Sequence, residues 1–207
     1  PFSNDPVAGR LANTATEWDP VTGVLFRNPN PAEAVATNAT LGINTIVDSG
    51  IINYLNKFGE VSTTRPMKSI DPVSELYYAA LRYLKNQGNV PSYSNVTDAS
   101  AAGRYETADA FPVVTNWADP VSYSCQANVL LGIGDTNTHV DKNLPGPTNA
   151  FREPVKPALV TADTTVDVVA LMERIRVIEP GLPAANTQNF SGRDNSAYIA
   201  SLAYHAN

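Results

Sequence analysis

The sequence predicts an α/β fold, with one central strand and four helices, from three observations. The 207-residue chain is 43% apolar, which is enough to bury a core. Residues 127–133 (Ala-Asn-Val-Leu-Leu-Gly-Ile) form a near-continuous apolar run, typical of a strand buried on both faces of a parallel sheet. Four other segments repeat apolar residues at helical spacing. We therefore expect helices packed on a sheet in which residues 129–133 are a central strand.

The N-terminal part is predicted to be mostly irregular. Residues 1–45 contain several X-Pro pairs, and a residue before proline is pushed out of the helical region. Residues 21–26 are a candidate strand or hairpin arm. Residues 48–59 predict a short amphipathic helix that Asp48 or Ser49 can cap and that Gly59 ends.

The clearest predicted helix follows Asp71, which is an N-cap residue type, while Pro72 suits the first helical position. Its expected inward stripe consists of Val73, Leu76, Tyr77, Ala80 and Leu84. Residues 89–124 show no sustained period, so we expect a long loop or insertion there. Two further helices are predicted over residues 165–179 and 194–206.

A strand buried on both faces needs neighbours on both sides to satisfy its backbone. The chain offers only residues 21–26 and 113–117 as weak candidates. Either these segments supply the neighbours, or the chain is cut from a longer α/β domain whose other strands lie outside it. The sequence begins with Pro1 and shows no basic-then-apolar leader, which favours a processed product or a fragment.

Composition and charge exclude several classes of protein. The formal net charge is −6 and the basic residues are scattered, which disfavours a nucleic-acid binder. No apolar run reaches the roughly 18 to 20 residues that span a bilayer. Cys125 is the single cysteine, so no disulfide forms within the chain. We expect its thiol to be buried or bridged to a cysteine outside the chain.

Side chains that can bind a metal ion gather directly after the predicted central strand. Asp135, Asn137, Asp141 and Asn143 carry oxygen ligands, and His139 lies among them. Open α/β sheets bind ligands at the carboxyl ends of their strands, and carboxylate and amide oxygens suit a hard divalent cation such as Mg²⁺ or Ca²⁺. The spacing is not that of an EF-hand, and the Gly-Ile-Gly run before it lacks the third glycine of a dinucleotide fingerprint.

Residues 125–146 combine a cysteine-led strand with the run G-D-T-N-T-H-V-D-K-N-L-P-G. This combination resembles the signature of the PilY/PilC family of type IV pilus tip adhesins and assembly factors. Five more blocks resemble that family in the same order, and they are residues 18–29, 49–59, 72–83, 111–117 and 195–204. The resemblance therefore extends over nearly the whole chain.

The resemblance implies a von Willebrand factor A-like module, a doubly wound sheet with flanking helices that is incomplete in this chain. Such modules often carry a metal-ion-dependent adhesion site. Carried over, Asp135 matches the aspartate after the fourth strand and Asp71 takes the position of a threonine, with Asn137 or Asp141 supporting these ligands. The D-x-S-x-S loop of such sites is absent from the 207 residues, so we expect the chain alone to bind the ion weakly, on the order of millimolar.

The same residues also have structural explanations. Asp71 can cap a helix without any metal, and Asp135 can simply order its loop. His139 and His205 are the only histidines, too few for a catalytic cluster.

We expect a non-enzymatic adhesion and pilus-assembly module at the pilus tip on the bacterial surface. Its expected partners are minor pilins, a host or surface receptor and the remainder of its own longer chain. The alternatives are a structural pilus subunit without metal and a secreted hydrolase. For the hydrolase, the sequence offers neither G-x-S-x-G nor H-E-x-x-H.

Overall fold

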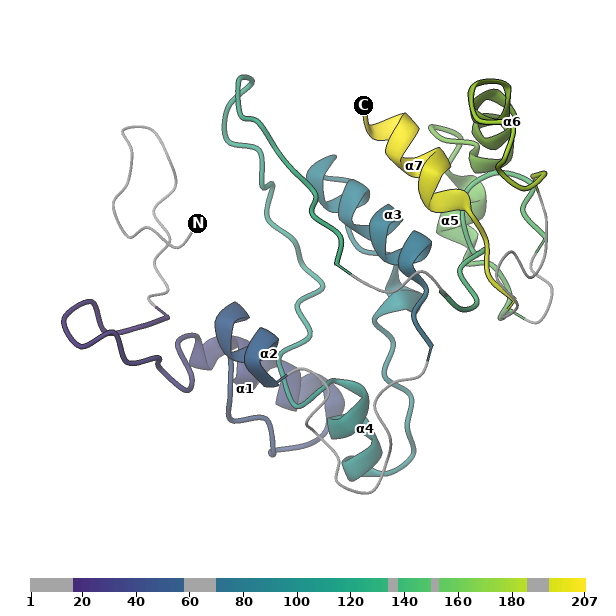
Figure 1. Ribbon diagram of the computed structural model, residues 1–207. Coiled ribbons are helices and arrows are strands. Elements are labelled where there is room, and N and C mark those ends of the chain that lie inside the picture. The colour runs from purple at the N-terminus through teal and green to yellow at the C-terminus, as the bar shows by residue number, and fades with distance from the viewer. Residues whose placement is uncertain (1–16, 58–69, 134–137, 150–152, 186–193) are drawn as a thin grey trace. The chain divides into compact units, whose positions relative to one another are not determined.

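The computed structural model describes residues 17–57, 70–133, 138–149, 153–185 and 194–207, and over these residues the chain is helical (Figure 1). The helices are α1 (Pro31–Leu41), α2 (Ile51–Lys57), α3 (Val73–Leu84), the 3₁₀ helix η1 (Pro91–Tyr93), α4 (Ala101–Thr107), α5 (Ala158–Ala162), α6 (Val168–Ile178) and α7 (Tyr198–Ala206). None of these described helices is long and apolar enough to cross a membrane.

The chain divides into two compact units. Unit 1 comprises Pro1–Lys68, Ser94–Asn116 and Ser122–Ser124. Unit 2 comprises Ser69–Tyr93, Trp117–Val121 and Cys125–Asn207. Each unit has a hydrophobic cluster of its own, built on α1 and α4 in unit 1 and on α3, α5, α6 and α7 in unit 2.

The predicted α/β fold with a von Willebrand factor A-like sheet is wrong, because the described residues contain no strand. Residues 129–133 form no ladder. Val129, Leu131 and Ile133 are 87%, 83% and 92% exposed, while Leu130 packs against the core of unit 2. An apolar run indicates that a segment tends to be buried, but it does not show which strands would pair with it. The second weak candidate, residues 113–117, forms no strand either.

The candidate hairpin arm at residues 21–26 is a tight turn closed by a single antiparallel bridge between Trp18 and Leu25. The Asp19 N–H donates to the Val24 carbonyl at 2.9 Å. The Asp19 carboxylate accepts two backbone N–H groups inside the turn. The segment thus folds back on itself but adds no strand to a sheet.

Helix α1 lies in the part of the chain that was predicted to be irregular. Pro31 occupies its first turn, and Gly42, with φ +61°, ends it in the left-handed conformation. The proline rule restricts Asn30, the residue before proline, whereas proline itself is well suited to the first position of a helix. The X-Pro pair therefore marks the start of a helix and does not exclude one.

Helix α2 confirms the predicted helix, but its apolar side chains are not buried, since Ile51 and Leu55 are 57% and 69% exposed. Neither Asp48 nor Ser49 caps it. The Glu17 carboxylate instead accepts the first two backbone N–H groups of the helix, both at 2.9 Å. Asp48 pairs with Arg27 at 2.6 Å and with Lys57 at 2.8 Å. The predicted end at Gly59 lies outside the described residues.

Helix α3 is confirmed, but its buried face is rotated from the predicted stripe. Leu76 is 70% exposed, while Tyr78 and Arg82 are buried. Their partner is Asp163, whose carboxylate accepts the Tyr78 hydroxyl at 2.6 Å and lies 3.7 Å from the Arg82 guanidinium. This buried ion pair turns polar side chains inward, which a purely apolar pattern does not anticipate.

Helices α6 and α7 are also confirmed, each beginning a few residues later than predicted. The side chain of Asp167 caps α6 by accepting two backbone N–H groups. Helix α4 lies within the predicted loop of residues 89–124, where the Ser100 hydroxyl accepts the Gly103 N–H. Helices α3, α6 and α7 pack together through Tyr78, Met172 and Leu202.

Candidate functional site

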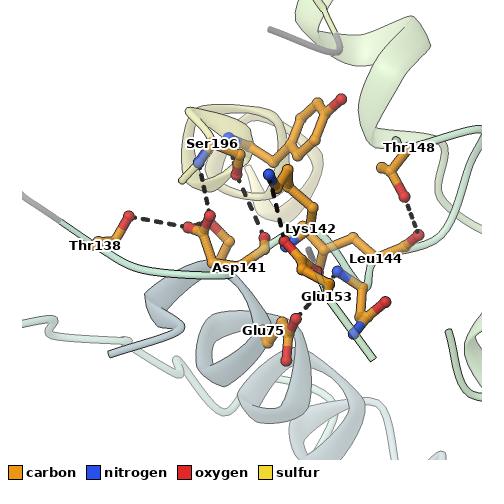
Figure 2. A network of polar contacts seen from close by, with 11 residues as sticks. Glu75, Thr138, Asp141, Lys142, Leu144, Thr148, Glu153 and Ser196 are labelled. Atoms are coloured by element: carbon orange, nitrogen blue, oxygen red, sulfur yellow. Dashed lines mark hydrogen bonds and ion pairs between the residues drawn. The ribbon is translucent and has the colours of Figure 1, made fainter. Parts of the chain in front are cut away.

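The motif Asp-Lys-Asn-Leu-Pro-Gly at residues 141–146 is the centre of a buried polar network in unit 2 (Figure 2). Asp141, Lys142 and Asn143 are 0%, 1% and 5% exposed. Three consecutive polar residues are rarely buried unless their polar groups find partners inside the protein. The surrounding segments provide most of these partners.

Asp141 receives three hydrogen bonds on its carboxylate. The Ser74 hydroxyl donates at 2.7 Å, the Thr138 hydroxyl at 3.2 Å and the Ser196 N–H at 2.7 Å. These donors come from the first turn of α3, from the motif's own segment and from the residues just before α7. A buried carboxylate with this many donors is well compensated for its lost hydration.

Lys142 is held by Glu153 through both its backbone and its side chain. The two carboxylate oxygens share the Lys142 N–H at 3.0 and 3.1 Å. The Lys142 ammonium lies 3.6 Å from Oε1 of Glu153, and the two side chains are 1% and 0% exposed. Burial raises the pKa of Glu153 to about 7, although the neighbouring ammonium opposes this shift.

Asn143 is fastened to α3 and to η1. Its N–H donates to Oε1 of Glu75 at 3.0 Å, and its carbonyl accepts the Tyr93 hydroxyl at 2.8 Å. Burial raises the pKa of Glu75 to about 8. The hydrogen bond from Asn143 opposes this shift, and the charges of Glu153 and Asp141 add to it. The burial effect therefore outweighs the hydrogen bond.

The end of the motif is fixed to the start of α6. The Val168 N–H donates to the Pro145 carbonyl at 3.1 Å, and the Lys156 ammonium donates to the Gly146 carbonyl at 2.8 Å. Gly146 has a φ of +103°, and a Cβ there would lie 2.5 Å from a carboxylate oxygen of Asp167. Only glycine fits this position.

Of the predicted metal-site residues, Asp71 lies two residues before α3, and Asp141 contacts the first turn of α3 through Ser74. The Asp71 carboxylate contacts Nδ1 of His139, and the His139 N–H donates to the Asp71 carbonyl at 3.3 Å. The predicted N-cap role of Asp71 is wrong, because Pro72 is the N-cap of α3 and no side chain caps this helix. Asp135 and Asn137 lie outside the described residues.

Among the residues that the structure describes, no group of three or more His, Cys, Asp or Glu side chains could hold a metal ion. Asp71 contacts His139, and Asp141 is fully buried with both carboxylate oxygens hydrogen-bonded. In this arrangement both side chains fasten the segment 138–143 to α3. Asp141 suits a supporting role beside a metal ligand better than direct coordination, since its oxygens already have donors.

Cys125 was expected to be buried or bridged outside the chain, and the expected burial is wrong. Its thiol is free and exposed. The apolar run that follows it is itself largely exposed, so nothing in the described structure draws the thiol into a core. A bridge to a cysteine outside the chain remains a prediction.

Residue type and spacing did not single out several residues that complete the network, namely Ser74, Glu75, Glu153 and Ser196. Ser74 and Glu75 lie in the first turn of α3, where such residues are common for reasons of helix stability alone. Glu153 stands beside a proline with no periodic pattern around it. A local pattern cannot indicate a partner that lies 55 to 68 residues away in the chain.

Comparison with known proteins gives two matches. A family model for the second domain of PilY1 homologs matches residues 10–201. The type IV pilus biogenesis factor PilY1 homolog of Xylella fastidiosa is 51% identical over 211 residues, which cover 97% of this chain and 17% of that protein. The chain thus spans less than a fifth of the length of this relative. No solved structure matches.

Proposed function

Since the chain belongs to the PilY1 family, we propose that it is a domain of a type IV pilus biogenesis factor and serves as a non-enzymatic module in pilus assembly and adhesion. The observation that carries this proposal is the 51% identity over 97% of the chain with a protein named as such a factor. The family resemblance of the motif blocks is thereby confirmed.

The buried network supports a structural role for the motif at residues 141–146, which belongs to one of the blocks that resemble the family. The polar groups of Asp141 and the backbone N–H groups of Lys142 and Asn143 bind side chains of the same unit. A network of this kind rigidifies a fold and presents the surrounding surface in one conformation. A module with one defined surface is suited to pilus assembly and to recognition, because both require that surface to bind a partner.

The proposed place of action is the bacterial surface, at the pilus tip. Minor pilins, a host or surface receptor and the remainder of the longer chain are the proposed partners. The name of the Xylella fastidiosa relative supports a role in pilus biogenesis, and the small share of that protein that this chain covers supports partners within the same polypeptide.

The role in biogenesis is tested in a bacterium whose pili depend on a full-length PilY1-family protein that carries this domain. Deletion of residues 17–207 should reduce surface pili and adhesion while the shortened protein still reaches normal levels. A matched strain with Asp119→Ala, which removes an exposed carboxylate, should keep its pili. Normal piliation and adhesion in the deletion strain would contradict the proposal.

A metal-dependent form of adhesion is a second, separate proposal. It places a divalent ion near Asp135, with Asp71 beside it and Asn137 or Asp141 in support. The contact of Asp71 with His139 supports it, because this contact brings Asp71 to the segment that follows Asp135. In a purely structural module, the same residues would hold the segment without any ion.

Calorimetric titration with Mg²⁺, Ca²⁺ and Mn²⁺ separates these two forms. The chain and a longer piece that includes the preceding residues are each compared with their Asp135→Ala variants. Metal dependence predicts weak binding by the chain, tighter binding by the longer piece and loss in both variants. Equal heats in all four samples would favour the structural module.

The competing secreted hydrolase is tested on ester, peptide and glycoside substrates. We expect no turnover by the purified chain. Turnover that a single substitution abolishes would overturn the non-enzymatic proposal, since a background contaminant would be unaffected by the substitution.

A further inference from the structure

The network around residues 141–143 contains more acid than base, and its acids are buried or half-buried. Its carboxyl groups belong to Glu75, Asp141 and Glu153. Its basic groups are the ammonium of Lys142 and, near Glu153, the ammonium of Lys156. With every group ionised, the cluster would carry three negative charges and two positive charges. Excess buried charge is unfavourable, so one of the carboxyl groups is expected to keep its proton.

Glu75 has the weakest support for a negative charge. Asp141 has three hydrogen-bond donors, and Glu153 has both the N–H and the ammonium of Lys142. In the described structure the Glu75 carboxyl accepts one hydrogen bond, from the Asn143 N–H. A single neutral donor compensates poorly for the burial of a full charge.

The groups that face Glu75 do not supply the missing positive charge. From the motif segment comes Asp141, from the following loop comes Glu153, and from η1 comes the phenol of Tyr93. The ammonium of Lys142 lies against Glu153 and is already balanced by it. The nearby carboxylates repel a charge on Glu75, and Tyr93 is neutral, with its own pKa raised by burial.

We infer that Glu75 is a proton-dependent latch: its protonated form fastens the segment 141–146 to α3, and loss of the proton weakens this attachment. This inference does not rest on the proposed function. An ionised Glu75 would accept a stronger hydrogen bond from the Asn143 N–H, but it would also lose its hydration and face two carboxylates. The raised pKa of Glu75, about 8, indicates that the second effect is larger.

The sign of the pH effect follows from this shift. The folded pKa of about 8 lies above the ordinary value of 4.5, so the folded chain binds more protons than the unfolded chain between these values. The stabilisation is complete below pH 4.5 and is lost as the pH rises through 8. The raised pKa of Glu153, about 7, acts in the same direction. Unit 2 should therefore be less stable at pH 9 than at pH 6.

Thermal unfolding between pH 5 and pH 9 tests the latch with the whole chain. The wild type and Glu179→Gln, a control at an exposed position at the end of α6, should show midpoints that fall by several degrees from pH 6 to pH 9. Glu75→Gln imitates the protonated acid and should lose most of this fall. An equally steep fall in Glu75→Gln would overturn the inference.

A second measurement decides the matter if Glu75→Gln does not fold. Carbon-13 NMR follows the side-chain carboxyl carbons of the wild-type chain, with Glu75 assigned through its link to the Asn143 amide. Its resonance should titrate with a midpoint well above the ordinary glutamate value of 4.5. A midpoint near 4.5 for Glu75 would overturn the inference, whatever the variant does.

Discussion

Asp141 joins three segments of unit 2 through one carboxylate. Asp141→Ala removes the acceptor that the Ser74 hydroxyl and the Ser196 N–H share, and leaves these donors buried. Each lost partner costs about 1 to 3 kcal/mol, so the free energy of unfolding should fall by about 3 kcal/mol. Urea denaturation measures this change. The exposed control Glu179→Ala should stay within about 0.5 kcal/mol of wild type. Equal losses in both variants would refute the central role of Asp141.

Gly146 offers a second test at the level of one residue. A methyl group there would meet the Asp167 carboxylate at 2.5 Å, and the φ of +103° is strained for any residue with a Cβ. Gly146→Ala should therefore destabilise the chain by more than about 1 kcal/mol. Gly132→Ala is a matched control, because nothing lies within 4 Å of its added carbon. Comparable thermal midpoints for the two variants would show that the contact is not tight.

The sequence pattern indicated Asp141 and Asp71 as site residues but not the contacts that they make. Residue type and spacing indicate that oxygen ligands are concentrated in a segment. They do not show whether a metal ion, a hydroxyl or a histidine meets those oxygens. The Ser74 hydroxyl reaches Asp141 across 67 residues of sequence, and Asp71 meets His139 across 68.

At the scale of the element, the start of α6 depends on one side chain. Asp167 accepts the N–H groups of Val169 and Ala170, both at 3.0 Å. Asp167→Ala should lower the free energy of unfolding by about 1 kcal/mol, because two donors of the first turn lose their acceptor. Asp167→Ser, which can still cap, should retain most of the stability. Chemical denaturation distinguishes the two, and identical losses would contradict the capping role.

The helix starts also show which local rules hold in this chain. Asp167 caps α6 from the adjacent position, as N-cap preferences anticipate. Helix α2 is capped by Glu17, 34 residues before its first N–H, because the nearer Asp48 is engaged with basic side chains. N-cap preferences apply to a side chain that has no other partner. A side chain that pairs with a residue distant in the sequence no longer caps the helix.

At the scale of the whole molecule, the packing of α3, α6 and α7 carries the stability of unit 2. Leu202 of α7 is fully buried in this core, whereas Leu76 of α3 is 70% exposed. Leu202→Ala should lower the free energy of unfolding by about 2 to 5 kcal/mol, through lost burial and the cavity left behind. Leu76→Ala should change it by less than about 0.5 kcal/mol. Similar denaturation midpoints for the two variants would contradict the assignment of Leu202 to the core of unit 2.

The sequence alone was sufficient to predict the family and four of the helices. Motif blocks in a fixed order indicated the family, and apolar spacing found α2, α3, α6 and α7, because helical hydrogen bonds and helix faces depend on neighbours three and four residues apart. Only the tertiary structure decided that residues 129–133 form no strand and that Glu75, Asp141 and Glu153 share one buried network. Strand pairing and buried polar contacts join residues that are distant in the chain, so a local pattern gives no information about their partners.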